Sequence, residues 1–258
     1  MSNLNDAQMV SVVMPVFNAE KYIETAITSV LKNSYKLLEL IIINDCSTDN
    51  SMEIINRIKA TDNRVFCLEN KVQLGAAGSR NLEIKNANGR FLAFCDADDV
   101  WSHSKLECQI SSMLRQGAVI SHTSYSVINE HGMHIGTRRL LGEGYTSYRE
   151  MLFRNRIGFS TCVIDRIAFE SLVMPNCRHE DYAFLLNLMR GGIQALTIPI
   201  NTGSYRIHSK NLSKSKLKSV IWHFNVLGGQ EKQPFFLAFT FTLFGRLRLI
   251  FSRTFDPL

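Results

Sequence analysis

The chain of 258 residues is long enough for one α/β domain or for one domain and a small appendage, and its 45% of hydrophobic residues can build a core. The formal charge of +6 is unevenly placed, because residues 203–258 carry nine Lys and Arg against two Asp and Glu, which leaves 20 against 21 in residues 1–202. This neutral first part, without interleaved basic and aromatic residues, disfavours a nucleic-acid-binding protein.

Strands alternate with helices along the first hundred residues. Apolar runs predict strands at residues 9–14, where Pro15 ends the run, and at 37–43, 65–68 and 91–95. Apolar residues at helical spacing predict helices at 22–31 and 52–58, and a third helix opens at Gly75 and runs to about Asn86. Such an alternation with short loops predicts βαβ units, a parallel sheet and right-handed crossovers.

Polar clusters follow all four predicted strands. They are Pro15-Val16-Phe17-Asn18, Asn44-Asp45, the segment 75–80, and Asp96 to Asp99. Ligands of parallel sheets bind outside the carboxyl ends of the strands, so these clusters are expected to line one crevice. The small residues from Gly75 to Gly78 allow the backbone to approach a ligand closely.

The fourth cluster places three carboxylates, Asp96, Asp98 and Asp99, within four positions. Ionised side chains that close together repel one another, so they need a cation or another local compensation. Oxygen ligands suit Mg²⁺ or Mn²⁺, and Mg²⁺ typically takes one or two protein carboxylates and the phosphates of a substrate. The alternative is an acidic loop that caps the next helix, with Asp99 or Ser102 as the N-cap.

In their order and spacing, four motifs resemble those of the family-2 inverting glycosyltransferases of the GT-A fold. They are Val12 to Asn18, Ile43 to Asp49, Gly78 to Asn81, and the DXD-type Asp96 to Asp99. The likeness covers about residues 10–105 and continues more weakly to about 210. It implies an α/β fold with a Rossmann-like, mostly parallel sheet flanked by helices. The catalytic domain would span 1–210, with a nucleotide-binding half (1–105) and an acceptor half (106–210), and a basic, Phe-rich helical tail would follow at 211–258.

The resemblance also implies roles for single residues. The base would be contacted by Pro15, Val16, Phe17, Asn18 and Asp45. Arg80 would lie beside the base or the diphosphate, Asp96 would hold the ribose, and Asp98 would bind the Mg²⁺ or Mn²⁺ that bridges the two phosphates. Cys46 departs from the pattern, because the family often has Gly at this position after two acidic residues.

Further candidates come from the second half of the chain. The pair Glu180-Asp181 precedes an apolar helical pattern, and in the resembling family such a pair marks the general base, which assigns Asp181 with Glu180 as the fallback. The alternative is a helix cap favoured by the macrodipole. His208 could complete the metal's ligands or be a solvated loop histidine, and Arg206 or Lys210 could reach the diphosphate.

The segment 118–175 is expected to determine acceptor specificity. It contains a predicted strand at 118–129, a turn, a partner strand at 133–138 and a short helix at 148–153. No Gln-x-x-Arg-Trp follows the acidic pair, which favours transfer of a single sugar over the processive synthesis of some relatives.

Breaking the bond between an anomeric carbon and a nucleoside diphosphate develops negative charge on the leaving phosphate, which a cation stabilises, while a carboxylate base deprotonates the acceptor. The predicted function is therefore metal-dependent, inverting transfer of one sugar from a nucleoside-diphosphate sugar, with UDP as the expected nucleotide. The expected acceptor is a hydroxyl of a glycan or of a lipid-linked oligosaccharide in polysaccharide biosynthesis. The alternative is a non-catalytic nucleotide-sugar binding module. A dinucleotide enzyme is disfavoured, because no GxGxxG follows the first strand.

The tail is the most aromatic part of the chain, with eight of the sixteen Phe after residue 203. One helical face would carry Phe235, Phe236, Phe239, Leu243, Phe244, Leu247, Ile250 and Phe251, with Arg246, Arg248 and Arg253 nearby. The uninterrupted apolar run 235–244 is shorter than the ~20 residues needed to span a bilayer. We expect an amphipathic helix that lies on a membrane surface, or alternatively one that packs against the domain or a second subunit.

Six scattered cysteines without CxxC spacing, and no secretory leader at the start of the sequence, predict a cytoplasmic protein with reduced thiols. Together with the tail, this places the expected site of action on the inner face of the cell membrane, as a peripheral protein.

Overall fold

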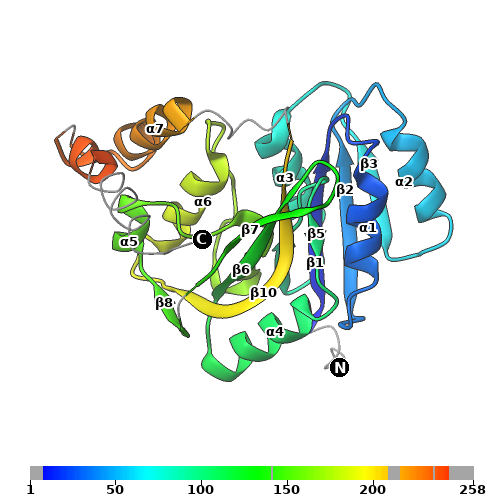
Figure 1. The fold of residues 1–258 in the computed structure, drawn as a ribbon, viewed down its shortest axis with the longest axis horizontal. Coiled ribbons are helices and arrows are strands. Elements are labelled where there is room, and N and C mark those ends of the chain that lie inside the picture. The colour runs from blue at the N-terminus through cyan, green and yellow to red at the C-terminus, as the bar shows by residue number, and fades with distance from the viewer. Residues whose placement is uncertain (1–7, 141, 209–215, 235, 244–258) are drawn as a thin grey trace.

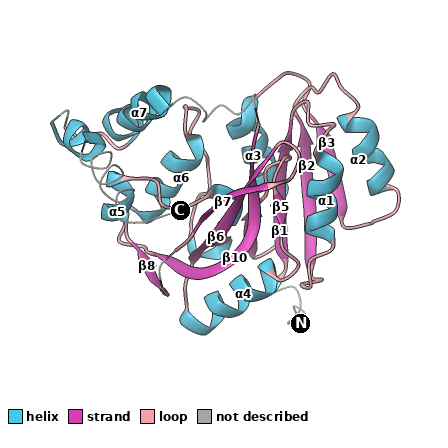
Figure 2. Cartoon of the chain, viewed as in Figure 1, coloured by secondary structure: helices cyan, strands magenta, loops and turns pink. Residues whose placement is uncertain are grey.

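The computed structural model describes residues 8–140, 142–208, 216–234 and 236–243. One mixed sheet runs through the molecule with helices around it, as Figures 1 and 2 show. The strands are β1 (Val10–Val16), β2 (Leu38–Asn44), β3 (Val65–Glu69), β4 (Phe91–Phe94), β5 (Val100–Trp101), β6 (Ile120–Asn129), β7 (His134–Arg138), β8 (Gly144–Thr146), β9 (Val163–Asp165) and β10 (Ala195–Ile207). The helices are α1 (Ile23–Leu31), α2 (Ser51–Lys59), α3 (Gly75–Asn86), α4 (Lys105–Gln116), α5 (Tyr148–Phe153), α6 (Glu180–Met189) and α7 (Lys216–Asn225), with short turns η2 (Phe159–Thr161), η3 (Arg166–Ala168) and η5 (Val226–Gln230).

The strand order is β3-β2-β1-β4-β9-β6-β10-β5, with β7 on β6 and β8 on β10. Strands β1 to β4 pair in parallel, as the alternation of strands and helices predicts. Strand β1 continues beyond its predicted end and includes Pro15. The nitrogen of Pro15 faces the β4 side, where pairing ends at Val13, so its missing N–H costs the sheet no hydrogen bond.

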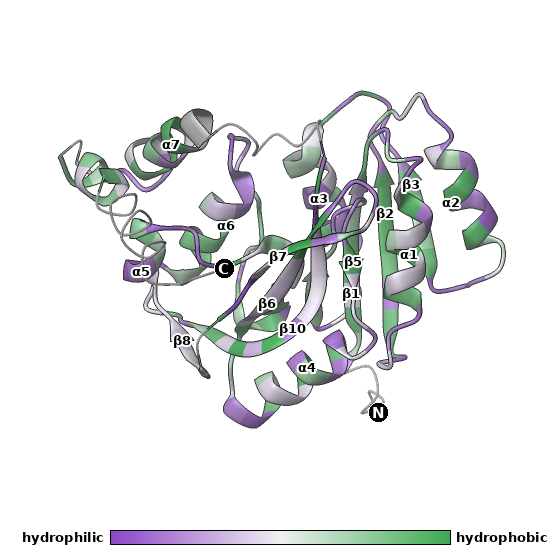
Figure 3. Ribbon diagram, viewed as in Figure 1, coloured by the Kyte–Doolittle hydropathy of each residue, from purple (hydrophilic) through white to green (hydrophobic). Residues whose placement is uncertain are grey.

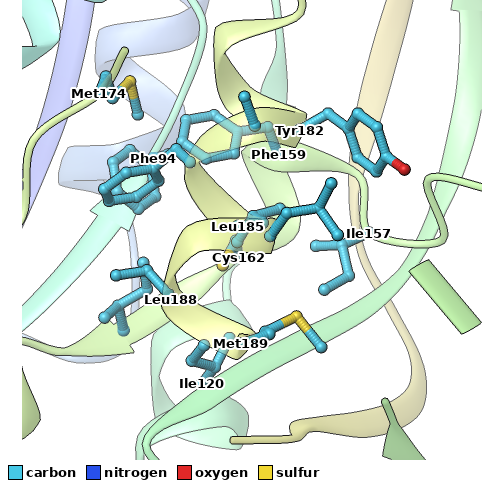
Figure 4. Close-up of a cluster of buried hydrophobic side chains, with 14 of the residues drawn as sticks. Phe94, Ile120, Ile157, Phe159, Cys162, Met174, Tyr182, Leu185, Leu188 and Met189 are labelled. Atoms are coloured by element: carbon cyan, nitrogen blue, oxygen red, sulfur yellow. The ribbon is translucent and has the colours of Figure 1, made fainter. Parts of the chain in front are cut away.

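Apolar residues alternate between two cores, one on each face of the sheet. Helices α1, α2 and α4 cover the even-numbered residues of β1 and β2, such as Val12 and Ile42. Helices α3 and α6 cover the other face, where Phe94 packs among Phe159 and Phe184. Figure 3 shows the apolar interior along the strands, and Figure 4 shows part of the second core. Strands β1, β2 and β4 are buried on both faces because helices cover both, whereas Phe66 and Leu68 of the edge strand β3 are half exposed.

In the second half of the chain, β6 and β7 form the predicted antiparallel hairpin, and α5 occupies the predicted helix. Strand β10 runs parallel to β6, and its register shifts twice between Ile198 and Ser204. At these irregularities the strand bends, and Figure 1 shows it curving away from β8; farther along, Gly203 and Ser204 pair with β5. The end of β10 is thereby carried to the carboxyl edge of the parallel strands, where Arg206 and His208 join the acidic loop.

The tail packs against the second half of the domain. Val226, Leu227 and Ala238 are buried in the core that contains α6, and the ring of Phe241 meets that of Phe153 edge to face at 4.8 Å. The predicted apolar face nevertheless points outward where the structure describes it, because Phe236 and Phe239 are 74% and 51% exposed. The rest of that face, with Phe235, residues 244–258 and their arginines, lies outside the described residues, as does Lys210. Among the residues described, no helix has the length and apolar character to cross a bilayer.

Candidate active site

The acidic loop after β4 meets the end of β10. The Nε2 atom of His208 lies 2.9 Å from Oδ2 of Asp98, which joins two residues 110 positions apart in the sequence. Burial, and next the charge of Asp96, raise the pKa of the Asp98 carboxyl, whereas His208 opposes the shift. The two predicted metal ligands therefore lie together, and His208 is not a solvated loop residue.

Asp99 is the most buried acid of this loop, with 1% of its surface exposed. Its Oδ1 accepts a hydrogen bond from the backbone N–H of Arg206 at 3.0 Å, and the hydroxyl of Ser160 also bonds to it. Burial, and next Asp98, raise its pKa well above the ordinary value. The alternative of an acidic helix cap is wrong for Asp99 and Ser102, because α4 begins at Lys105 and Ser104 occupies its N-cap position.

Asp98 and His208 fit a divalent cation. A carboxylate oxygen and an imidazole nitrogen 2.9 Å apart are close enough to share one ion, and Mg²⁺ and Mn²⁺ accept such ligands together with phosphate oxygens. Asp99 Oδ2 is buried and accepts no hydrogen bond from the described residues, so the loop has more acceptor capacity than the protein uses. Among the described residues, no group of three or more His, Cys, Asp or Glu side chains is arranged to hold an ion, so Asp98 and His208 are a pair of candidate ligands without a third of these types.

Arg80 connects the two halves of the site. It lies on α3, is only 6% exposed, and has its guanidinium 5.0 Å from the centre of the Phe159 ring. One terminal nitrogen donates to Oδ1 of Asp96 at 2.5 Å, and the other donates to Oε1 of Glu180 at 3.1 Å. Burial alone would lower the pKa of Arg80, but Asp96 and Glu180 outweigh it and keep the guanidinium charged. The buried guanidinium of Arg80 thus connects Asp96, which follows β4, with Glu180, the first residue of α6.

The pair Glu180-Asp181 occupies the first turn of α6, and both residues are half-buried. Burial, and next the charge of Asp181, raise the pKa of Glu180, whereas Arg80 lowers it. Asp181 forms no hydrogen bond or ion pair with another described residue, although its charge reaches Arg80. Of the two acids, Glu180 is therefore engaged with Arg80 and Asp181 is available to accept a proton.

Asp45 holds a loop in this structure. Its buried carboxylate accepts hydrogen bonds from the side chain of Asn70 at 2.6 Å and from the backbone N–H groups of Leu74 and Gly75, both at 2.8 Å. These bonds fix the connection from β3 to α3, which carries Arg80. The contact of Asp45 with a nucleotide base stays a prediction, and it would require some of these donors to be replaced.

Phe17 presents an exposed apolar ring in the first loop. Pro15 and Val16 belong to β1, and the backbone oxygen of buried Val16 accepts from the N–H of Asp45. Asn18 has a positive φ of 49°, and its Oδ1 accepts from the N–H of Thr48 at 2.8 Å. Phe17, half exposed, is the best placed of the four predicted base contacts to stack on a ligand.

Arg206 is buried, and its side chain donates hydrogen bonds to backbone carbonyl groups. Its Nε donates to the carbonyl of Asp98 at 2.8 Å, one terminal nitrogen donates to the carbonyl of Asn129 at 3.1 Å, and the guanidinium lies 4.7 Å from the centre of the Tyr22 ring. Tyr22 also stacks on His208, with ring centres 5.4 Å apart. The contact of Arg206 with the diphosphate stays a prediction, whereas its visible contacts tie the acidic loop to β10 and to the turn after β6.

The sequence did not indicate Tyr22, Phe159 or Ser160 as part of the site. Tyr22 sits in the loop after β1, so its place at the carboxyl edge could have been noticed. Phe159 and Ser160 lie in a stretch without helical or strand periodicity, and Ser160 reaches the site because its hydroxyl accepts from the N–H of Asp96 at 3.3 Å. Only the folded chain reveals those two.

A mixed α/β sheet with an acidic loop, a buried arginine and a carboxylate pair at its carboxyl edge defines a glycosyltransferase of the predicted GT-A fold. Residues 11–173 match the model of glycosyl transferase family 2, and the chain belongs to that family. The family and the fold that the motifs predicted are thereby confirmed.

Relatives of similar length support this assignment. The chain is 36% identical over 87% of its length to an uncharacterized glycosyltransferase of Haemophilus influenzae, and it covers 89% of that protein. It is 32% identical over 95% of its length to the Escherichia coli UDP-Glc:alpha-D-GlcNAc-diphosphoundecaprenol beta-1,3-glucosyltransferase WfaP, and it covers 97% of that protein. It is 34% identical over 82% of its length to TuaG of Bacillus subtilis, a putative teichuronic acid biosynthesis glycosyltransferase, of which it covers 84%.

Solved structures share the fold at low sequence identity. The S. aureus TarS 1-349 structure in complex with UDP-GlcNAc has a TM-score of 0.72 and 16% identity, over 96% of this chain and 74% of that one. Mannosyltransferase PcManGT from Pyrobaculum calidifontis, in complex with GDP-Man and Mn2+, has a TM-score of 0.67 and 14% identity, over 96% and 76%.

Proposed function

We propose that this glycosyltransferase moves one sugar, with inversion, from a nucleoside-diphosphate sugar to a hydroxyl of a glycan or lipid-linked acceptor in surface-polysaccharide biosynthesis. The observation that carries the proposal is the buried link from Asp96 through Arg80 to Glu180, because it joins the expected donor side to the expected base side. UDP is the proposed nucleotide, which is supported by the name of WfaP and by the UDP-GlcNAc complex of TarS.

The reaction assigns a task to each acid. The acceptor oxygen forms a bond to the anomeric carbon, the bond from that carbon to the diphosphate breaks, and its electron pair leaves with the nucleoside diphosphate. Asp181 takes the proton of the acceptor hydroxyl, because it is free of hydrogen bonds to the described residues. Arg80 pairs with Glu180 and orients it beside Asp181. Asp98 and His208 would hold a Mg²⁺ or Mn²⁺ ion, which would supply positive charge at the leaving diphosphate.

The test measures release of nucleoside diphosphate from UDP-sugars with and without acceptor. Asp181→Asn should retain donor binding and lower turnover by about 10²- to 10⁴-fold, because a positioned base contributes that much. Glu53→Gln, at an exposed acid on α2, is the control and should leave turnover unchanged. Full turnover in Asp181→Asn would refute the base, and donor binding by the wild type without any turnover would favour the non-catalytic binding module.

The metal is tested by donor binding in calorimetry. Chelator, Asp98→Asn and His208→Gln should each weaken the binding of UDP, since these two residues would hold the ion whose positive charge attracts the diphosphate. UDP affinity that is indifferent to chelator would contradict the metal assignment and leave the base assignment standing.

We also propose that the protein acts as a peripheral protein on the inner face of the cell membrane. Phe236, Phe239 and Leu243 form an exposed apolar side of the helix at 236–243, whereas Ala238 on its opposite side is buried against the domain. An apolar helix face of this kind inserts into the boundary of headgroups and acyl chains. The domain therefore covers one side of the helix and leaves the other for lipid.

Sedimentation with vesicles that contain anionic lipid tests this assignment. The double variant Phe236→Ser and Phe239→Ser should remain in the supernatant while the wild type sediments. Ile167→Ser, which removes an equally exposed apolar residue on η3, is the control and should sediment like the wild type. Equal sedimentation of all three proteins would contradict the membrane role.

A further inference from the structure

Helix α7 is fastened beside the first turn of α6, the helix that carries Glu180 and Asp181. The ring of Tyr182 stacks on that of His223, with centres 5.1 Å apart and planes at 27°. The Nε2 atom of His223 lies 3.1 Å from the carbonyl oxygen of Leu152, and Figure 1 shows α7 next to α6. The tail thus returns to the start of the helix that carries the acidic pair.

The contact between the two helices places Trp222 at the residues that precede the acidic pair. The indole ring meets the imidazole of His179 edge to face, with ring centres 5.2 Å apart. The guanidinium of Arg178 lies 5.9 Å from the centre of the same indole. Arg178, His179 and Trp222 therefore form a cluster directly before the proposed base, which we call the acceptor shelf.

The acceptor shelf is partly exposed to solvent, unlike the neighbouring Tyr182. Tyr182 is fully buried, whereas Trp222 and His179 are only half-buried and Arg178 is exposed. Arg178 forms no ion pair with a described carboxylate, so its charge is available to a ligand. The shelf offers a half-buried indole ring, a positive charge and an imidazole, and two of these groups directly precede the acidic pair in the chain.

These groups match one class of ligand. A guanidinium binds phosphate oxygens through charge-assisted hydrogen bonds, and an indole face packs against the apolar side of a sugar ring. We propose that the acceptor shelf binds the sugar and diphosphate of a glycosyl diphosphate lipid, with the phosphates at Arg178 and the sugar on Trp222, so that a sugar hydroxyl reaches Asp181. The inference rests on the proposed function, because it takes Asp181 to be the base.

Binding tests the shelf without requiring turnover. The probe is N-acetylglucosaminyl diphosphate on a short alkyl chain, compared with the alkyl glycoside of the same sugar without the diphosphate, each titrated calorimetrically into the full chain. Arg178→Ala should weaken the diphosphate probe about tenfold, one charge-assisted interaction, and leave the alkyl glycoside unchanged. Trp222→Leu should weaken both probes, because both carry the sugar.

His223→Ala is the matched control, because it loosens the attachment of α7 without removing a group of the acceptor shelf. If Trp222 only fastened the helix, His223→Ala would weaken probe binding as much as Trp222→Leu does, and the proposal would be wrong. Equal affinity of wild type and Arg178→Ala for the diphosphate probe would also overturn it.

Kinetics separate this inference from the proposed function. In an active enzyme, Arg178→Ala should raise the KM for the diphosphate acceptor about tenfold and leave the KM for the UDP-sugar and its slow hydrolysis without acceptor unchanged. A wild type that binds UDP-sugars and never releases UDP would refute the proposed function, while the calorimetric comparison would still decide whether the shelf binds the probe.

Discussion

At the residue scale, Cys46 stands in a backbone conformation that favours glycine. Its φ is +62°, and it occupies the position where the resembling family often has Gly. The left-handed conformation costs a residue with a Cβ roughly 1–2 kcal/mol, part of which glycine loses again through its flexibility in the unfolded chain. The departure in sequence therefore coincides with strained backbone at the end of β2.

Cys46→Gly should raise the free energy of unfolding by about 1 kcal/mol and the Tm by about 2–4 °C. Thermal and urea unfolding measure both quantities. Cys46→Ala is the control, since it removes the thiol but keeps the Cβ, and it should give no such gain. A gain of equal size in Cys46→Ala would show that the thiol and not the φ angle is responsible.

Lys105 is a second unusual residue, because its ammonium is buried with no carboxylate bonded to it. Its Nζ donates to Gln109 Oε1 at 2.5 Å and to the carbonyl of Thr161 at 3.1 Å, and it lies 4.8 Å from the centre of the Trp101 ring. Burial lowers the pKa of Lys105 to about 7. Between that pH and the ordinary pKa of a lysine, the unfolded chain binds a proton that the folded chain does not.

The unfolding free energy of the wild type should therefore rise relative to that of Lys105→Met as pH increases from about 7 to 10, by up to about 1.4 kcal/mol per pH unit. Urea unfolding of both proteins across this range measures the difference. A difference that stays constant with pH would mean that Lys105 keeps its proton in the folded state.

Residue types were easier to predict than their partners. The sequence indicated that Asp45, Arg80 and Arg206 belong to one crevice, because each follows or ends a strand at the carboxyl edge. Their contacts depend on distances across the fold, such as the 100 positions between Arg80 and Glu180, and no local pattern encodes them. Asp45 and Arg206 consequently show roles in holding backbone that their motifs did not suggest.

At the element scale, the turn η2 links the two halves of the site. Trp101 donates from its indole nitrogen to the carbonyl of Ser160 at 3.1 Å, and Lys105 and Gln109 bond to that of Thr161. The turn in return places Phe159 under Arg80 and Ser160 against the acidic loop. An element of three residues without periodicity thus supports both the arginine and the acids.

Gly158→Ala should disturb this turn. A Cβ at Gly158 would lie 2.6 Å from Cε1 of Tyr125, so the ring or the turn must move, at a cost of about 1–3 kcal/mol in stability and with a lower turnover number. Gly136→Ala is the control, because a Cβ there meets nothing within 4 Å. Adding Tyr125→Ala to Gly158→Ala should restore both quantities, and failure to do so would contradict the steric explanation.

The elements themselves were predictable to different degrees. The strands of residues 10–95 followed from apolar runs, because β1, β2 and β4 are buried on both faces, and the helices followed from apolar residues at helical spacing. The bent middle of strand β10 did not, because its residues Pro199 to Ser204 lack a regular apolar pattern and depend on partners in β6 and β5. Pairing with distant strands decided the structure there.

At the scale of the whole molecule, the tail is part of the folded domain. The side chain of Glu231 is fully buried, pairs with Arg190 at 2.9 Å, and accepts from the hydroxyl of Tyr148 at 2.5 Å. These contacts tie the segment after α7 to α5 and to the end of α6. The described part of the tail is thus attached to the domain through Glu231, whereas Phe236 and Phe239, a few residues later, are exposed.

Glu231→Gln should weaken this attachment by about 1–2 kcal/mol, because it removes a charge from two hydrogen bonds and Arg190 is half exposed. Limited proteolysis should then cut the variant faster within residues 226–243, with the rest of the domain intact. Glu170→Gln, at an exposed acid far from the tail in the sequence, is the control and should be cut at the wild-type rate. Equal rates in all three proteins would mean that other contacts hold the tail.

The two ion pairs of Arg80 limit which segments can be exchanged between such enzymes. One guanidinium pairs with Asp96 in residues 1–105 and with Glu180 in the second half of the chain, and breaking a buried ion pair by removing one partner costs about 3–5 kcal/mol. A chimera that joins residues 1–105 to the second half of a relative should therefore lose stability unless the graft brings its own carboxylate to Arg80. The ion pairs of Arg80 with Asp96 and Glu180 therefore determine where two such proteins can be recombined, more than the length of the connecting segment does.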